Sequence, residues 1–86
     1  MNNKKFHFTI TDVARFLGKS PVTLRGWERQ GLIKFPRDGT DRKFTCEEVI
    51  DVADRAISLK RIKWERYELL CAAITILKII EKENKK

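Results

Sequence analysis

Apolar residues near the start of the chain recur at the spacing of a short helix. The three that define it are Val13, Ala14 and Leu17. Thr11 is the expected N-cap, because its hydroxyl can accept a hydrogen bond from a free backbone N–H of the first turn. Gly18 follows directly and is a typical helix stop. The preceding residues 8–10 alternate briefly and predict a short strand or an extended lead-in.

A second short helix is predicted from Pro21 to about Gln30. Ser20 is the expected N-cap, and a proline is favoured at the first helical position because the N–H that it lacks would have no partner there. Gly31 ends the pattern. Gly26 lies inside it, although glycine is about 1 kcal/mol less favourable than alanine within a helix. Two short helices joined by a turn are typical of a helix-turn-helix motif.

A β-hairpin is expected directly after the second helix. Asp38 and Gly39 form the strongest short-range hairpin signal in the chain, with apolar and basic residues on both sides. Residues 33–35 and 43–45 are expected to pair across this turn. Pro36 limits the first arm to an edge strand, because proline has no N–H to donate to a neighbour. The hairpin extends the motif to a winged helix-turn-helix.

Two longer helices follow the hairpin. Thr45 and Glu48 form a capping box that opens a third helix. The last helix is expected from about Lys63 to Glu83 and is apolar around most of its girth, so it must be covered on more than one side. Its first row, expected to pack on the body of the domain, is Trp64, Tyr67, Leu70, Cys71, Ile74 and Leu77. Its second row, which needs a partner, is Leu69, Ala73, Ile76 and Ile80.

The predicted fold is mainly α, a winged helix-turn-helix with a short β-hairpin wing and a C-terminal dimerisation helix. Residues 1–7 are expected to form a flexible arm, residues 8–60 the winged domain, and residues 61–86 the oligomerisation helix with a basic tail. The polar stretches 2–5 and 81–86 are expected to fray. The predicted oligomer interface is Leu69, Ala73, Ile76, Leu77 and Ile80.

The charge of the chain indicates a polyanionic partner. Its 86 residues include 19 Lys+Arg and 12 Asp+Glu, which leaves a net charge of +7 and a pI near 9.7. Eight basic and three acidic residues lie between Arg15 and Lys43, so +5 of this charge belongs to the helix-turn-helix and its wing. Such clusters neutralise phosphates and release counterions. Nucleic acid is the first candidate, followed by an anionic membrane or an acidic protein.

Other classes of function find little support in the sequence. No apolar run has the length of a membrane span and the N-terminus lacks the apolar region of a signal peptide, so we expect a cytoplasmic, nucleoid-associated protein that binds no membrane. Cys46 and Cys71 are far from each other in the sequence, and neither has another cysteine or a histidine nearby, so no zinc site is expected. Both are interpreted as reduced thiols. No catalytic set of residues is present, so neither enzymatic activity nor a cofactor or metal is expected.

Several motifs coincide at the spacings of a known family. The matching segments are FTITDVARFLGKSPVTLRGWERQGLI and, after the hairpin, RKFTCEEV, which together cover residues 8 to about 57. This pattern resembles the DNA-binding domain of MerR-type regulators, and specifically a small, excisionase-like or phage- or plasmid-type member without an effector domain. The resemblance implies operator binding as a dimer joined by a C-terminal helix. No effector-responsive switch is expected.

The resemblance also implies which residues approach DNA. Positions 22, 23, 25 and 27 of the second helix would face the duplex, and basic wing residues would hold the flanking backbone. An arginine fork suits both guanine and phosphate, and a valine can meet a thymine methyl group. Trp27 is either a backbone contact through its N–H or a plain core aromatic. The full predicted DNA-binding set is Lys19, Ser20, Val22, Thr23, Arg25, Trp27, Arg37, Arg42 and Lys43.

The chain departs from the family pattern at two places, one in the second helix and one in the wing. Gly26 stands where the family has the first of two aromatic residues, and either admits a close approach of another element or fits tight packing. Thr40 and Asp41 replace a Gly-Tyr pair before the wing arginine, which weakens the expected grip at Asp41.

The expected function is sequence-specific binding of double-stranded DNA by a dimeric transcription regulator. One alternative is a DNA-organising factor, acting in excision, genome packaging or segregation, that binds repeated sites cooperatively. Another is a protein-interaction module whose basic face binds an acidic partner. Cooperative binding to repeated sites would favour the first alternative. Weak DNA binding together with tight binding to another protein would favour the second.

Overall fold

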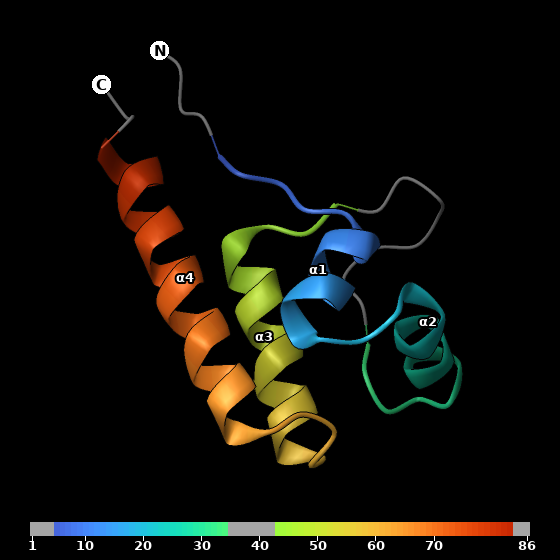
Figure 1. Ribbon diagram of the computed structural model, residues 1–86. Coiled ribbons are helices and arrows are strands. Elements are labelled where there is room, and N and C mark those ends of the chain that lie inside the picture. Colours follow the sequence, from blue (N-terminus) through green and yellow to red (C-terminus); the bar gives the residue numbers. More distant parts are fainter. Residues whose placement is uncertain (1–4, 35–42, 84–86) are drawn as a thin grey trace.

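The computed structural model describes residues 5–34 and 43–83, and this part of the chain is mainly helical (Figure 1). The helices are α1 (Ile10–Leu17), α2 (Pro21–Arg29), α3 (Cys46–Ser58) and α4 (Trp64–Glu83). No strand is found among the described residues, apart from an isolated β-bridge between Phe8 and Phe44. The turn of the predicted hairpin, with Pro36, Asp38, Gly39 and most of the wing, lies outside them.

Helix α1 begins two residues earlier than the sequence predicts. Its N-cap is Thr9, whose hydroxyl accepts from the backbone N–H of Asp12 (3.1 Å), while the Asp12 carboxylate accepts from the N–H of Thr9 (3.0 Å). The predicted cap, Thr11, would have had Ala14 at the third helical position, which has no side-chain acceptor to return the bond. The reciprocal pair of bonds therefore selects Thr9, and Ile10 belongs to the helix instead of a strand.

Phe44 pairs with Phe8, whereas the sequence predicted pairing of residues 43–45 with residues 33–35. The two residues exchange both backbone hydrogen bonds, at 2.9 and 2.7 Å. Phe44 is fully buried, and the Phe8 ring packs edge-on against Phe16 of α1 at 5.3 Å. Aromatic burial on both sides of this bridge joins the lead-in of α1 to the lead-in of α3.

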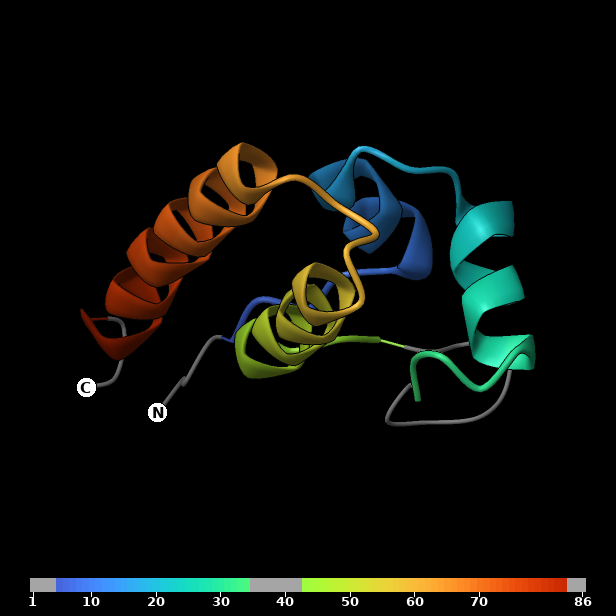
Figure 2. The same ribbon diagram turned by 90° about the horizontal axis from the view of Figure 1, so that it is seen from below.

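The core fills the space between all four helices. Figures 1 and 2 show α1 and α3 between α4 on one side and α2 on the other. Helices α3 and α4 pack against each other along their lengths and run in opposite directions (Figure 1). The buried apolar residues are Val13, Ala14, Leu17, Leu24, Trp27, Ile33, Phe44, Cys46, Val49, Val52, Ala53, Ala56, Ile62, Leu70 and Ile74. Helix α2 contributes to this core with one face only, which leaves its other face open.

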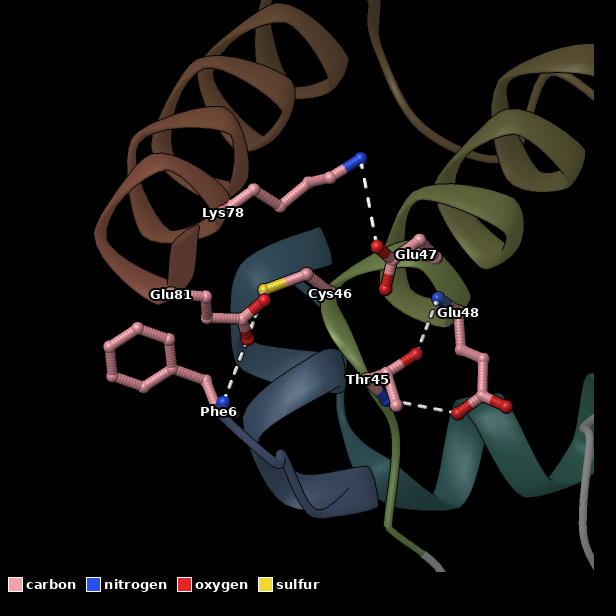
Figure 3. A network of polar contacts seen from close by, with 7 residues as sticks. All are labelled: Phe6, Thr45, Cys46, Glu47, Glu48, Lys78 and Glu81. Carbon is pink, nitrogen blue, oxygen red and sulfur yellow. Dashed lines mark hydrogen bonds and ion pairs between the residues drawn. The ribbon is translucent and has the colours of Figure 1, made fainter. Parts of the chain in front are cut away.

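The C-terminal end of α4 is tied to two other segments. Glu81 accepts hydrogen bonds from the backbone N–H of Phe6 (2.7 Å) and from the Cys46 thiol (3.4 Å), as Figure 3 shows. Lys78 adds an exposed ion pair with Glu47 of α3 at 3.9 Å. Residues 81–83, which the sequence predicted to fray, are therefore helical, because Glu81 has partners at both the N-terminal lead-in and the start of α3.

The exposed row of α4 follows the sequence prediction, whereas Trp64 does not. Leu70 and Ile74 are buried, and Leu69 and Ile76 are 64% and 58% exposed. Trp64 was predicted to pack on the domain, but its side chain is 57% exposed and donates to Glu68 on its own helix at 2.6 Å. Tyr67 instead carries the contact with α3, because its hydroxyl donates to Asp54. This bond raises the pKa of the Tyr67 phenol.

The two thiols should differ strongly in reactivity. Both cysteines are free, Cys46 is buried, and its pKa is raised from 9.0 to about 12 by burial, by its hydrogen bond to Glu81 and by the charge of that carboxylate. At pH 8 the buried Cys46 would carry very little thiolate, so iodoacetamide should modify half-buried Cys71 long before Cys46. Mass spectrometry of partly alkylated protein measures both rates, with urea-unfolded protein as the control. Equal rates in the folded protein would contradict this prediction.

Candidate nucleic-acid interface

Helix α2 divides cleanly into a buried and an open face. Leu24 is fully buried and Trp27 is 6% exposed, and both belong to the core. Val22 is 70% exposed and Arg25 is also exposed. An apolar side chain that is left in water beside a guanidinium has no role in the packing of this domain. The open face therefore carries the groups that can read a surface outside the chain.

The start of α2 is organised by two hydroxyl groups. Ser20 is the N-cap, and its Oγ accepts from the backbone N–H of Thr23 at 3.2 Å, while the two side-chain oxygens lie 3.0 Å apart. Pro21 occupies the first helical position, as predicted. The N-terminus of a helix carries partial positive charge, so this end favours an approaching phosphate. Ser20 and Thr23 shape that end of the helix and are exposed and partly exposed, respectively.

Trp27 belongs to the core, which was one of the two interpretations that its sequence position allowed. Its ring packs among buried apolar residues and only 6% of its surface remains accessible. An indole buried in this way stabilises the attachment of α2 to the domain through its large apolar surface. The structure therefore gives no support to the predicted backbone contact by Trp27.

Gly26 is not explained by tight packing against any described helix. A Cβ atom built at this position meets only Arg29, whose guanidinium Nη2 lies at 3.8 Å, among the described residues. That distance is an ordinary van der Waals contact. The backbone at Gly26 is helical, so an alanine would fit both the space and the conformation.

We therefore expect Gly26→Ala to stabilise the domain by about 0.5 to 1 kcal/mol, because alanine loses less conformational freedom in a helix. Gly31→Ala is the matched control. Gly31 has a φ of 77°, so the same added methyl group should cost about 1 kcal/mol there. Urea unfolding of the three proteins measures both shifts, and destabilisation by Gly26→Ala would reveal a close neighbour at this position.

A basic cleft lies beside the turn of the helix-turn-helix. It has a volume of about 480 Å³, and its charged lining residues are Lys19, Lys60, Arg61, Lys63, Glu65 and Arg66. Arg66 of α4 reaches across to Gly18. Its Nε lies 3.2 Å from the position that a Cβ atom would occupy if residue 18 had a side chain. The loop between α3 and α4 thus adds positive charge next to Lys19. Sequence reasoning missed this cleft, although Lys60–Lys63 is a visible basic run.

The segment that directly follows α2 is anchored to α3. Ile33 is buried, and Arg55 donates from Nε to the backbone carbonyl of Leu32 at 3.0 Å. Lys43, at the end of the predicted wing, is exposed. Arg37 and Arg42, which were predicted to hold the DNA backbone, lie outside the described residues. The residues that follow α2 are therefore fixed on α3.

Comparison with known proteins identifies the unit to which this face belongs. Residues 9–42 match the family model of the MerR family regulatory protein. This segment is similar to a MerR-type helix-turn-helix domain. Within the MerR-type domain, α1 and the core face of α2 hold the open face of α2 outward, and the match indicates DNA binding and a role in transcription regulation. No curated protein and no solved structure matches the chain.

The described parts of the chain show no sign of two other kinds of site. No cluster of His, Cys, Asp or Glu residues within 5–34 and 43–83 could hold a metal ion. Among these same residues, none of the helices combines the length and the apolar character needed to cross a membrane.

Proposed function

We propose that this chain is a dimeric transcription regulator that binds double-stranded DNA in a sequence-specific manner. The observation that carries the proposal is the open face of α2 in a MerR-type domain, where exposed Val22 and Arg25 stand opposite the buried Leu24 and Trp27. In this arrangement α2 enters the major groove, which is wide enough to admit an α-helix.

Arg25 and Val22 are the residues that read bases in this proposal. A guanidinium donates two parallel hydrogen bonds to O6 and N7 of guanine, and the branched Val22 side chain packs on a thymine methyl group. Both side chains point away from the core, so they reach a base edge without any repacking of the domain. Gly26 lies between them and the end of the helix and keeps this face free of a further side chain.

Phosphate contacts supply the affinity. The basic cleft is lined by Lys19, Lys60, Arg61 and Lys63, and Lys19 directly precedes Ser20, the N-cap of α2. Together with the wing they would hold the backbone on both sides of the groove. Because each neutralised phosphate releases counterions, binding should weaken steeply as salt rises.

The exposed apolar row of α4 supports the dimeric part of the proposal. Leu69, Ile76 and Ile80 are held in water on one side of a helix whose other side is packed in the core. Two copies joined through these residues would place two α2 helices on one duplex. Each would read a half-site about 34 Å from the other, which is one turn of B-DNA.

Selection of bound duplexes from a random pool at about 0.15 M salt tests the proposal. Enrichment of an inverted repeat with one fixed spacing supports a two-fold regulator and defines its site. Direct or phased repeats would favour the DNA-organising role instead. Retention of every sequence in a salt-sensitive manner would overturn sequence-specific reading, and no retention at all would overturn DNA binding by this chain.

A further inference from the structure

One oxygen atom near the end of α4 ties together two segments that are far apart in the chain. Oε2 of Glu81 accepts from the backbone N–H of Phe6 at 2.7 Å and from the thiol of Cys46 at 3.4 Å (Figure 3). Phe6 belongs to the lead-in of α1, and Cys46 is the first residue of α3. Glu81 is half-buried, which restricts the positions that its carboxylate can take. The carboxylate therefore holds both partners in place.

Both partners of Glu81 are close in sequence to the β-bridge between Phe8 and Phe44. Phe6 precedes Phe8 by two residues, and Cys46 follows Phe44 by two residues. The bridge consists of two backbone hydrogen bonds, at 2.9 and 2.7 Å. Glu81, the lead-in of α1 and the start of α3 therefore form a closed ring of contacts that includes the bridge. Loss of the acceptor at Glu81 would open this ring on both sides of the bridge at once.

The bridge is next to a basic residue of the predicted DNA-binding set. Lys43 directly precedes Phe44 and is exposed, whereas Phe44 is fully buried. The backbone from which the lysine extends is therefore fixed by the bridge. A cation on a fixed backbone binds a phosphate at a lower cost in conformational entropy than a cation on a mobile one. Figure 1 shows the end of α4 on the opposite side of the domain from α2, so Glu81 itself does not touch a duplex held by α2.

We propose that Glu81 is a positioning residue for DNA binding, which acts on Lys43 through the bridge between Phe8 and Phe44. The inference rests on the proposed function, because the predicted wing, which ends at Lys43, holds the DNA backbone there. Glu81 holds the residues on either side of the bridge, and the bridge fixes the point from which Lys43 reaches a phosphate. The end of α4 is thereby connected to a DNA contact that it does not touch.

The charge of Glu81 separates this inference from simple electrostatics. Removal of a carboxylate from a chain with a net charge of +7 makes the protein more cationic, and charge alone would then strengthen binding to a polyanion. If Glu81 positions Lys43, loss of its acceptor weakens binding instead. Glu81→Ala removes the charge and the acceptor together. Glu81→Gln removes the same charge but keeps an oxygen that can accept from Phe6 and Cys46, so it is the matched control.

Fluorescence anisotropy with the duplex enriched in the selection measures the effect on binding. Glu81→Ala is expected to bind about tenfold more weakly than the wild type, and Glu81→Gln at least as tightly as the wild type. Equal affinities of these two variants would overturn the inference. The double variant Glu81→Ala with Lys43→Ala should bind as weakly as Lys43→Ala alone, because a residue that acts through Lys43 has no effect once the lysine is gone. Additive losses would overturn the inference as well.

Amide hydrogen exchange, followed by NMR, tests the structural step without DNA. The amides of Phe8 and Phe44 should exchange slowly in the wild type, because each donates a hydrogen bond across the bridge. Glu81→Ala should accelerate the exchange of both amides about tenfold, whereas Glu81→Gln should leave it unchanged. Unchanged exchange in Glu81→Ala would overturn the inference even if its DNA affinity fell, because the bridge would then not transmit the effect.

The failure of this inference can be distinguished from the failure of the proposed function. If the proposed function is wrong, the wild-type protein enriches no duplex, and the inference is overturned with it. If the inference alone is wrong, the wild type still binds its duplex and only the expected differences between the variants are missing. Thermal unfolding and light scattering of every variant are the controls for folding and mass, and affinities are compared at a temperature at which all variants are folded.

Discussion

Arg25→Ala is expected to weaken binding to the selected duplex by about 1 to 3 kcal/mol, which corresponds to roughly 5- to 150-fold in the dissociation constant. The physical reason is the loss of a paired hydrogen bond to a base edge from a side chain that makes no contribution to the core. Thermal unfolding should stay unchanged, because Arg25 is exposed. Fluorescence anisotropy with a labelled duplex at about 0.15 M salt measures the effect.

Two further variants serve as controls for Arg25→Ala. Lys82→Ala removes the same charge at the far end of α4, and it should leave DNA affinity nearly unchanged. Arg25→Lys keeps the charge and loses the fork. If Arg25 reads guanine, the lysine variant should lose discrimination between the selected duplex and a mutated one. If Arg25→Ala binds the selected duplex with wild-type affinity and still discriminates against the mutated one, the proposal that α2 enters the major groove is wrong.

Ile76→Glu combined with Ile80→Glu should convert the dimer to a monomer. Ile76 is 58% exposed and Ile80 is 40% exposed, so the carboxylates are tolerated in the single chain but would be buried without partners between two copies. Light scattering should therefore report half the wild-type mass at micromolar concentration. Binding to an inverted repeat should fall toward the weaker affinity of one half-site.

Thr75→Glu is the matched control for this interface. Thr75 lies next to Ile76 and is exposed, but it belongs neither to the exposed apolar row nor to the core contacts of α4. The same kind of charge placed there should leave the mass of the dimer intact. Circular dichroism has to show wild-type helix content for every variant. An unchanged mass in the double isoleucine variant would disprove the interface on α4.

The interface also shows what sequence periodicity conveys and what it leaves out. The exposed row was predicted with Leu69, Ala73, Ile76 and Ile80, and the structure leaves these positions open. Leu77, which was assigned to the same interface, is half-buried against the core instead. Ile79 was missed, although it is 52% exposed. Because α4 is apolar around most of its circumference, its sequence does not distinguish the row that packs on the domain from the row that is exposed. The positions of α1 and α3 decide which residues are covered.

Local signals in the sequence determined several elements. Ser20 and Pro21 start α2, and the Thr45–Glu48 capping box starts α3, as predicted. Gly18 takes a left-handed conformation directly after α1. Each of these features depends on hydrogen bonds or backbone preferences within about four residues, so the amino-acid order alone contains them. The MerR-type motif and the basic charge are likewise properties of the order and composition of residues.

The tertiary structure decided the features that depend on segments far apart in the chain. Glu81 holds Phe6 across 75 positions and Cys46 across 35, and this converts a tail that was predicted to fray into the last turn of α4. Trp27 and Trp64 carry equally apolar rings, yet the first is in the core and the second is in water. The basic cleft exists because α4 returns Arg66 to Gly18. Burial and long-range contact depend on which faces meet when the helices pack, and the local pattern of residues does not contain that information.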